Sequence, residues 1–104
     1  MADFKSTATR QIGSTPVTIH SASADTVVVG VSASNIYGSE LPINIMHKRS
    51  SINTYILRDF RVGPGETKEL MQGNKIVLQS GDELLAQTSL ADGFDTVVSV
   101  LEGV

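Results

Sequence analysis

The sequence predicts an all-β domain, a single β-sandwich of the jelly-roll kind with eight to nine short, mainly antiparallel strands. Two observations lead to this prediction. Apolar side chains recur with a period of two along most of the chain, which is typical of strands with one buried face. Glycine, proline, asparagine and aspartate interrupt these runs at short intervals, as they do in sandwiches. The length of 104 residues suits one domain.

The first dozen residues differ from the rest because they are rich in Thr, Ser and Ala, with Phe4 and Ile12 as the large apolar groups. We therefore divide the chain into an N-terminal arm or edge strand, residues 1–14, and a β-sandwich domain, residues 15–104. An edge strand is the ordinary structure for such a segment. The alternative is an arm that adds a strand to the sheet of a neighbouring subunit.

Alternation is clearest in residues 41–48, where Leu41, Ile43 and Ile45 share one face of the expected strand. Two runs, 26–31 and 95–101, are apolar on both faces, which indicates central strands or strands covered on the outside by a partner. We expect strands near residues 4–12, 15–21, 26–35, 41–48, 53–61, 66–72, 75–79, 83–90 and 95–102.

Composition excludes several classes of function. The chain has no cysteine, so disulfides and thiolate metal sites are excluded. The first ten residues lack the apolar core of a signal peptide, and no apolar run is long enough to span a bilayer. The net charge of −3 argues against sequence-independent binding to DNA or RNA. We expect a protein made in the cytoplasm, with no membrane and no direct nucleic-acid partner.

A search for chemistry finds no catalytic site. His20 and His47 are far apart in sequence, and no serine or threonine stands in a nucleophile motif. We expect His47 to be solvated at a strand end and His20 to have a surface or turn role. Asp82, which follows Gly81, is expected to cap backbone N–H groups of its turn. The predicted protein is not an enzyme and has no metal site and no cofactor.

One stretch of the chain concentrates basic charge. Half of the eight basic residues lie within 14 positions, with Asp59 as the one acid between them. Three interpretations are open: a basic hairpin edge that discourages unwanted strand pairing, an interface with an acidic protein surface, or a nucleic-acid contact. The candidate interface residues of this stretch are Lys48, Arg49, Tyr55, Arg58, Phe60 and Arg61.

Five segments follow one another in a characteristic order: 39–46 (SELPINIM), 55–59 (YILRD), 62–67 (VGPGET), 74–82 (NKIVLQSGD) and 95–102 (DTVVSVLE). With these segments, from about Thr26 to Glu102, the chain resembles small virion structural proteins of tailed bacteriophages. In proteins of this kind a strand and small-residue turn lead to a proline-glycine turn, then to a K-I-V-L-x-x-G-D strand pair and a closing V-V-S-V-L-E strand.

The resemblance implies a non-enzymatic β-sandwich subunit of a phage particle, assembled in the host cytoplasm and located in the virion. It implies a homo-oligomer, a trimer or a ring, seated at the head–tail neck, on the tail or on the capsid surface beside other virion proteins. Phe4 and Arg10 of the N-terminal segment join the candidate contact residues. Two alternatives stay open: a capsid cement or decoration protein specifically, and a β-sandwich module that binds host-surface carbohydrate or protein.

Overall fold

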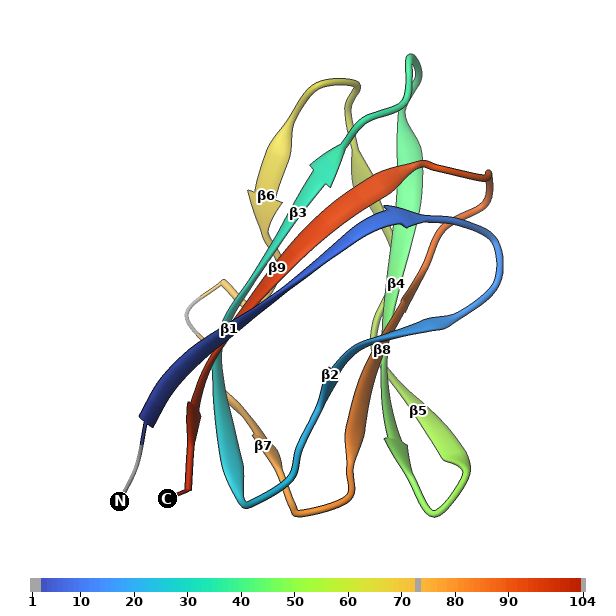
Figure 1. The fold of residues 1–104 in the computed structure, drawn as a ribbon. Coiled ribbons are helices and arrows are strands. Elements are labelled where there is room, and N and C mark those ends of the chain that lie inside the picture. Colours follow the sequence, from blue (N-terminus) through green and yellow to red (C-terminus); the bar gives the residue numbers. More distant parts are fainter. Residues whose placement is uncertain (1–2, 73, 104) are drawn as a thin grey trace.

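The computed structural model describes residues 3–72 and 74–103, and within these residues it contains strands and no helix. Two antiparallel sheets pack face to face as a sandwich (Figure 1). The predicted all-β sandwich is thereby confirmed. Its strands are β1 (Asp3–Ile12), β2 (Val17–Ser21), β3 (Thr26–Asn35), β4 (Leu41–Arg49), β5 (Ile52–Val62), β6 (Thr67–Glu69), β7 (Ile76–Leu78), β8 (Glu83–Gln87) and β9 (Phe94–Glu102).

The first sheet has five strands in the order β1-β9-β3-β6. The fifth strand, β7, also pairs with β3, at residues 26–28, whereas β6 pairs with residues 32–34. The two doubly apolar runs of the sequence are its central strands, β3 and β9, as expected. β1 is an edge strand that pairs with β9 from Asp3 opposite Glu102 to Ile12 opposite Phe94. The two ends of the described chain consequently lie side by side (Figure 1).

The second sheet has four strands in the order β2-β8-β4-β5. β4 and β5 form a hairpin closed by Ser50 and Ser51, which both have positive φ angles (52° and 65°). This is the geometry of a two-residue type I′ turn, whose twist matches that of the strands. With β7 as an additional short strand, the order of strands in the two sheets is that of a jelly roll.

The core lies between the sheets and consists of the inward side chains predicted by the alternation. Leu41, Ile43 and Ile45 of β4 are buried, and Phe94 of β9 is the largest fully buried side chain. Burial of this apolar surface is the main stabilising contribution to the fold.

β6 is shorter than predicted because the chain turns inward after Glu69. The Glu69 carboxylate accepts a hydrogen bond from the backbone N–H of Val31, and Leu70 N donates to Val31 O at 2.8 Å. The register of β3 shifts between Val28 and Gly30, and an ideal Cβ at Gly30 would lie 2.9 Å from a Glu69 carboxylate oxygen. Glycine thus makes room for the carboxylate that covers this bulge.

Candidate interaction surface

The solvent-facing side of the five-stranded sheet carries a row of apolar side chains that crosses four strands. Phe4 pairs with Leu101, Leu101 with Val27, and Val27 with Val77. Partners in an antiparallel pair project on the same face, and the adjacent Val28 and Val100 point into the core with no exposed surface. We call these four residues, from β1, β9, β3 and β7, the outer apolar row.

The two ends of the outer apolar row are its most exposed members. Phe4 at the β1 edge is 80% exposed and Val77 at the β7 edge is 59% exposed, whereas Val27 and Leu101 between them are half-buried. Val97 adds a further exposed apolar side chain to this face. A contiguous apolar strip on a solvent face is typical of a surface that binds a partner.

The basic residues of the second sheet do not all share one face. Arg61 pairs with Pro42 and Tyr55 with Met46 on the outer side, where the Arg58 guanidinium lies 5.4 Å from the centre of the Tyr55 ring. Phe60 instead pairs with Ile43 and packs against the core. The outer face therefore has Tyr55, Arg58 and Arg61, while the ring of Phe60 belongs to the interior side.

Met46 of β4 and Leu85 of β8 pair with each other and project outward. The next pair along these strands, Ile45 and Ala86, points into the core. Met46 and Leu85 are nearly buried, with 4% and 6% exposed. Flanking side chains therefore cover Met46 and Leu85, whereas Tyr55 on the same face is 51% exposed. Lys48 pairs with Asn53 and Glu83 beside them and is half-buried.

Arg49 and His47 converge on Asp82 at one end of the second sheet. Arg49 donates to the carboxylate from Nε at 2.9 Å and from Nη2 at 2.6 Å, and His47 Nε2 donates to it at 3.0 Å. The predicted capping role of Asp82 is confirmed, because Gln79 N donates to it at 2.9 Å. The prediction that His47 is solvated is wrong: its partner, Asp82, lies 35 positions away in the turn that precedes β8.

The Asp82 carboxylate is buried, and hydrogen bonds from Arg49, His47 and Gln79 N compensate its negative charge. The Arg49 guanidinium holds the pKa of Asp82 well below its usual range, and hydrogen bonds from Gln79 N and His47 act in the same direction against the opposing effect of burial. The side chain of Arg49 therefore binds within the chain, although it is 49% exposed.

We expect Asp82→Asn to lower the thermal unfolding midpoint at neutral pH and to flatten the acid dependence of stability. Because the folded-state pKa of Asp82 is depressed, the unfolded chain binds more protons at a pH below its own aspartate pKa of about 3.9. The stability that Asp82 contributes is present above that pH and is lost as the pH falls toward the folded-state pKa. Thermal melts between pH 7 and about pH 2 measure both effects.

The control is Glu83→Gln, which removes one negative charge from the next residue, where the carboxylate accepts from Thr18 Oγ1. This variant should keep the acid dependence of the wild type and a midpoint closer to it. An Asp82→Asn protein with the midpoint and acid dependence of the wild type would show that the Arg49–Asp82–His47 cluster does not stabilise the fold.

The second histidine, His20, is buried rather than on the surface or in a turn, so that prediction is also wrong. Its Nδ1 lies 3.0 Å from Thr7 Oγ1, and its Nε2, which has no hydrogen-bond partner among the described residues, lies 4.0 Å from a Glu102 oxygen. Burial lowers the pKa of His20. Lys5 binds Glu102 at 2.8 Å, which raises the pKa of Lys5 and lowers that of Glu102.

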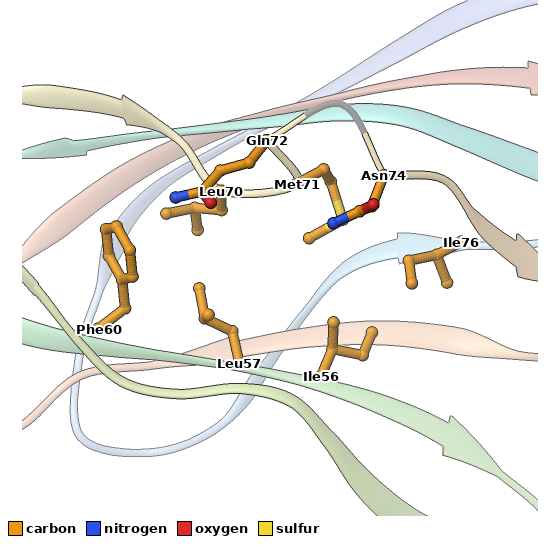
Figure 2. Close-up of a pocket in the computed structure, with 8 residues that line it drawn as sticks. All are labelled: Ile56, Leu57, Phe60, Leu70, Met71, Gln72, Asn74 and Ile76. Atoms are coloured by element: carbon orange, nitrogen blue, oxygen red, sulfur yellow. The ribbon is translucent and has the colours of Figure 1, made fainter.

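A groove of about 360 Å³ opens between β5 and the segment that joins β6 to β7. In Figure 2 the side chains of Ile56, Leu57 and Phe60 face those of Leu70 and Met71 across it. Gln72, Asn74 and Ile76 complete the lining, which contains no ionisable side chain. Such a groove can bind an apolar group but offers no acid, base or nucleophile among these residues.

Arg10, another of the sequence-predicted contact residues, lies on β1, the edge strand that also carries Phe4. Arg10 is exposed next to the register shift between Thr9 and Ile12, where Gln11 N donates to Asp95 at 2.8 Å. In residues 3–72 and 74–103, no group of three or more His, Asp or Glu side chains is placed to hold a metal ion. The same residues include no helix long and apolar enough to cross a membrane.

The fold is that of a jelly-roll sandwich, and it is shared with two solved structures of low sequence identity. A chain from Bacillus endospore appendages, which form a family of disulfide-linked pili, superposes with a TM-score of 0.61 at 13% identity, over 100% of this chain and 88% of the other. The nucleoplasmin-like N-terminal domain of Drosophila FKBP39 gives a TM-score of 0.51 at 12% identity, over 100% and 92%. No protein-family model and no curated protein matches the sequence.

Proposed function

We propose that this chain is a non-enzymatic structural subunit of a tailed-bacteriophage particle, which assembles with copies of itself, as a trimer or ring, and with other virion proteins. The observation that carries the proposal is the outer apolar row, with a phenylalanine 80% exposed at its end. Assembly would remove this surface from water, which is the main favourable contribution to most protein association.

Two further observations support assembly. Double-sheet jelly rolls are a recurrent architecture of viral capsid domains, and the sequence resembles small virion proteins over three-quarters of its length. One protein of similar fold builds pili, which are assemblies of many subunits. Those pili are disulfide-linked, whereas this chain has no cysteine. The contacts of this protein with its neighbours would therefore be made without disulfide bonds.

The groove favours assembly over a module that binds host-surface carbohydrate. Sugar-binding sites use aromatic side chains as stacking surfaces, and Phe60 is the one aromatic side chain in the groove lining. Phe60 also packs against the core. The proposal that goes with assembly is a position at the neck, on the tail or on the capsid surface, where copies of the protein would contact one another.

The proposal is tested by measuring mass in solution and location on particles. We expect light scattering at low to high micromolar concentration to show species heavier than the protomer, with one preferred multiple. We also expect mass spectrometry to find the protein in purified phage particles, and imaging of labelled particles to place it at the neck, tail or capsid surface. A strict monomer at high micromolar concentration that is also absent from particles would refute the proposal.

A further inference from the structure

The five-stranded sheet has two edges, and both leave backbone groups without strand partners. Among the described residues, β1 pairs with β9 alone, and β7 pairs with β3 alone. An unpaired strand edge presents N–H and C=O groups that can hydrogen-bond a strand of another chain. The outer apolar row runs from one of these edges to the other and ends in an exposed apolar side chain at each.

The directions of the strands are compatible with joining these two edges. β1 and β3 both run antiparallel to β9, so they run parallel to each other; β7 runs antiparallel to β3. A second copy in the same orientation, placed beside the first, would therefore bring its β1 antiparallel to β7. This arrangement continues both the alternation of strand direction and the outward face of the sheet.

The side chains at the two edges are suited to this contact. On its outer side β1 carries the uncharged Phe4, Ser6 and Ala8 before the exposed Arg10 near its C-terminal end, and Lys5 projects to the inner side, where it binds Glu102. β7 is the apolar tripeptide Ile76–Leu78. The long edge strand of the other sheet, β5, has three charged residues within four positions, Arg58, Asp59 and Arg61, exposed on it, and charge on an edge discourages pairing.

Resting on the proposed function, we propose that a second copy of this chain joins the first by pairing its β1 with β7, so that Phe4 of one copy lies against Val77 of the next. The outer apolar row would then continue from subunit to subunit. The contact is heterologous, since the two surfaces that meet are different, and such contacts close into a ring or extend into a filament. Phe4 and Val77 would be buried in every subunit that has neighbours on both sides.

Engineered cysteines test this contact directly because the chain contains no other thiol. In the variant with both Phe4→Cys and Val77→Cys, mild oxidation should give a ladder of disulfide-linked multimers on denaturing gels. An intrachain disulfide is excluded, because positions 4 and 77 are separated by three strand spacings, roughly 14 Å, whereas disulfides need Cα atoms within about 7 Å.

Three variants serve as controls for the ladder. Phe4→Cys and Val77→Cys alone should stay uncross-linked, since a heterologous contact never brings two copies of the same position together. The variant with both Phe4→Cys and Ile52→Cys places the second thiol at an exposed apolar position of β5 and should give no ladder. Circular dichroism of each variant confirms the fold, which these exposed positions leave intact.

Charge substitution provides a second readout. Phe4→Glu and Val77→Lys should each raise the dissociation constant of the assembly by about tenfold or more, as expected for interface anchors. The protein with both changes should recover much of the lost affinity, because the new glutamate of one copy faces the new lysine of the next. Ile52→Glu should leave the constant unchanged.

The outcomes separate this contact from the proposed function. Dimers with Phe4→Cys alone would show a two-fold contact and overturn the heterologous pairing, as would the absence of a ladder from an assembly that light scattering detects. In both cases the structural role stands and the β1–β7 contact falls. A wild-type chain that stays monomeric at every concentration and is absent from particles would overturn both.

Discussion

Phe94→Ala is expected to lower the free energy of unfolding by about 3–5 kcal/mol, the usual range for truncating a buried phenylalanine. Phe94 has no exposed surface and is the largest fully buried side chain. It pairs with Ile12 of β1 and Asn35 of β3, so its ring lies where both neighbouring strands of β9 meet the core. A domain of this size has a total stability of about 5–15 kcal/mol, so this variant would be near the limit of folding.

The three phenylalanines form an internal series for this measurement. Phe4→Ala, at an 80% exposed position, should change the stability of the monomer by less than about 0.5 kcal/mol. Phe60→Ala, at a half-buried groove position, should lie between the two. Urea unfolding at low protein concentration gives all three values at a constant m-value. Equal losses at positions 4 and 94 would contradict the assigned burial.

Asn35→Ala is expected to cost about 3 kcal/mol, because several buried polar groups would lose their partners at once. The Asn35 amide donates to Val62 O at 2.8 Å and to Ser39 O at 2.9 Å, and its carbonyl accepts from Tyr37 N at 2.7 Å. Val62 ends a strand of the second sheet, whereas Asn35 ends a strand of the first. The side chain thus links the two sheets at one end of the sandwich.

Two neighbouring substitutions make this experiment specific. Ser34→Ala removes an exposed hydroxyl contact with Thr67 and should change stability by less than about 0.5 kcal/mol. Asn35→Asp has nearly the same shape but replaces both donors with an oxygen that faces two carbonyl groups, so it should be at least as damaging as Asn35→Ala. Chemical denaturation at neutral pH ranks the three. An Asn35→Asp protein as stable as the wild type would show that the two donated hydrogen bonds are dispensable.

The strands themselves could be predicted from the sequence because period-two burial is a local signal. The expected strand 26–35 coincides with β3, and 41–48 and 95–102 differ from β4 and β9 by one residue. The prediction of 83–90 was too long at its C-terminal end, since β8 ends at Gln87. Thr88 is not paired with another strand. Its N–H donates to Gly13 O at 2.9 Å, and its hydroxyl donates to the backbone oxygen of Pro42.

The side-chain partners could not be predicted, because strands distant in sequence supply them. The sequence predicts that His47, next to Lys48 and Arg49, is solvated. In the fold, the β4–β8 pairing brings Asp82 within hydrogen-bond distance of it. His20 is buried because β1 crosses to place Thr7 against it. The outer apolar row likewise depends on the registers of three strand pairs. The sequence indicates part of this row, because the segments of β3 and β9 have apolar residues on both faces. It does not indicate that Val77 of β7 belongs to the row.

The adjacency of Asp3 and Glu102 has a practical consequence for engineering this protein. β1 begins and β9 ends at one corner of the sandwich (Figure 1). A fluorescent domain or affinity peptide fused before β1 or after β9 would therefore start close to Phe4, which pairs with Leu101. Such a fusion would obstruct one edge of the five-stranded sheet, whichever end carries it. Joining the ends by a short linker and opening the chain at the Ser50–Ser51 turn would give a circular permutant with every strand pairing retained and that corner unobstructed.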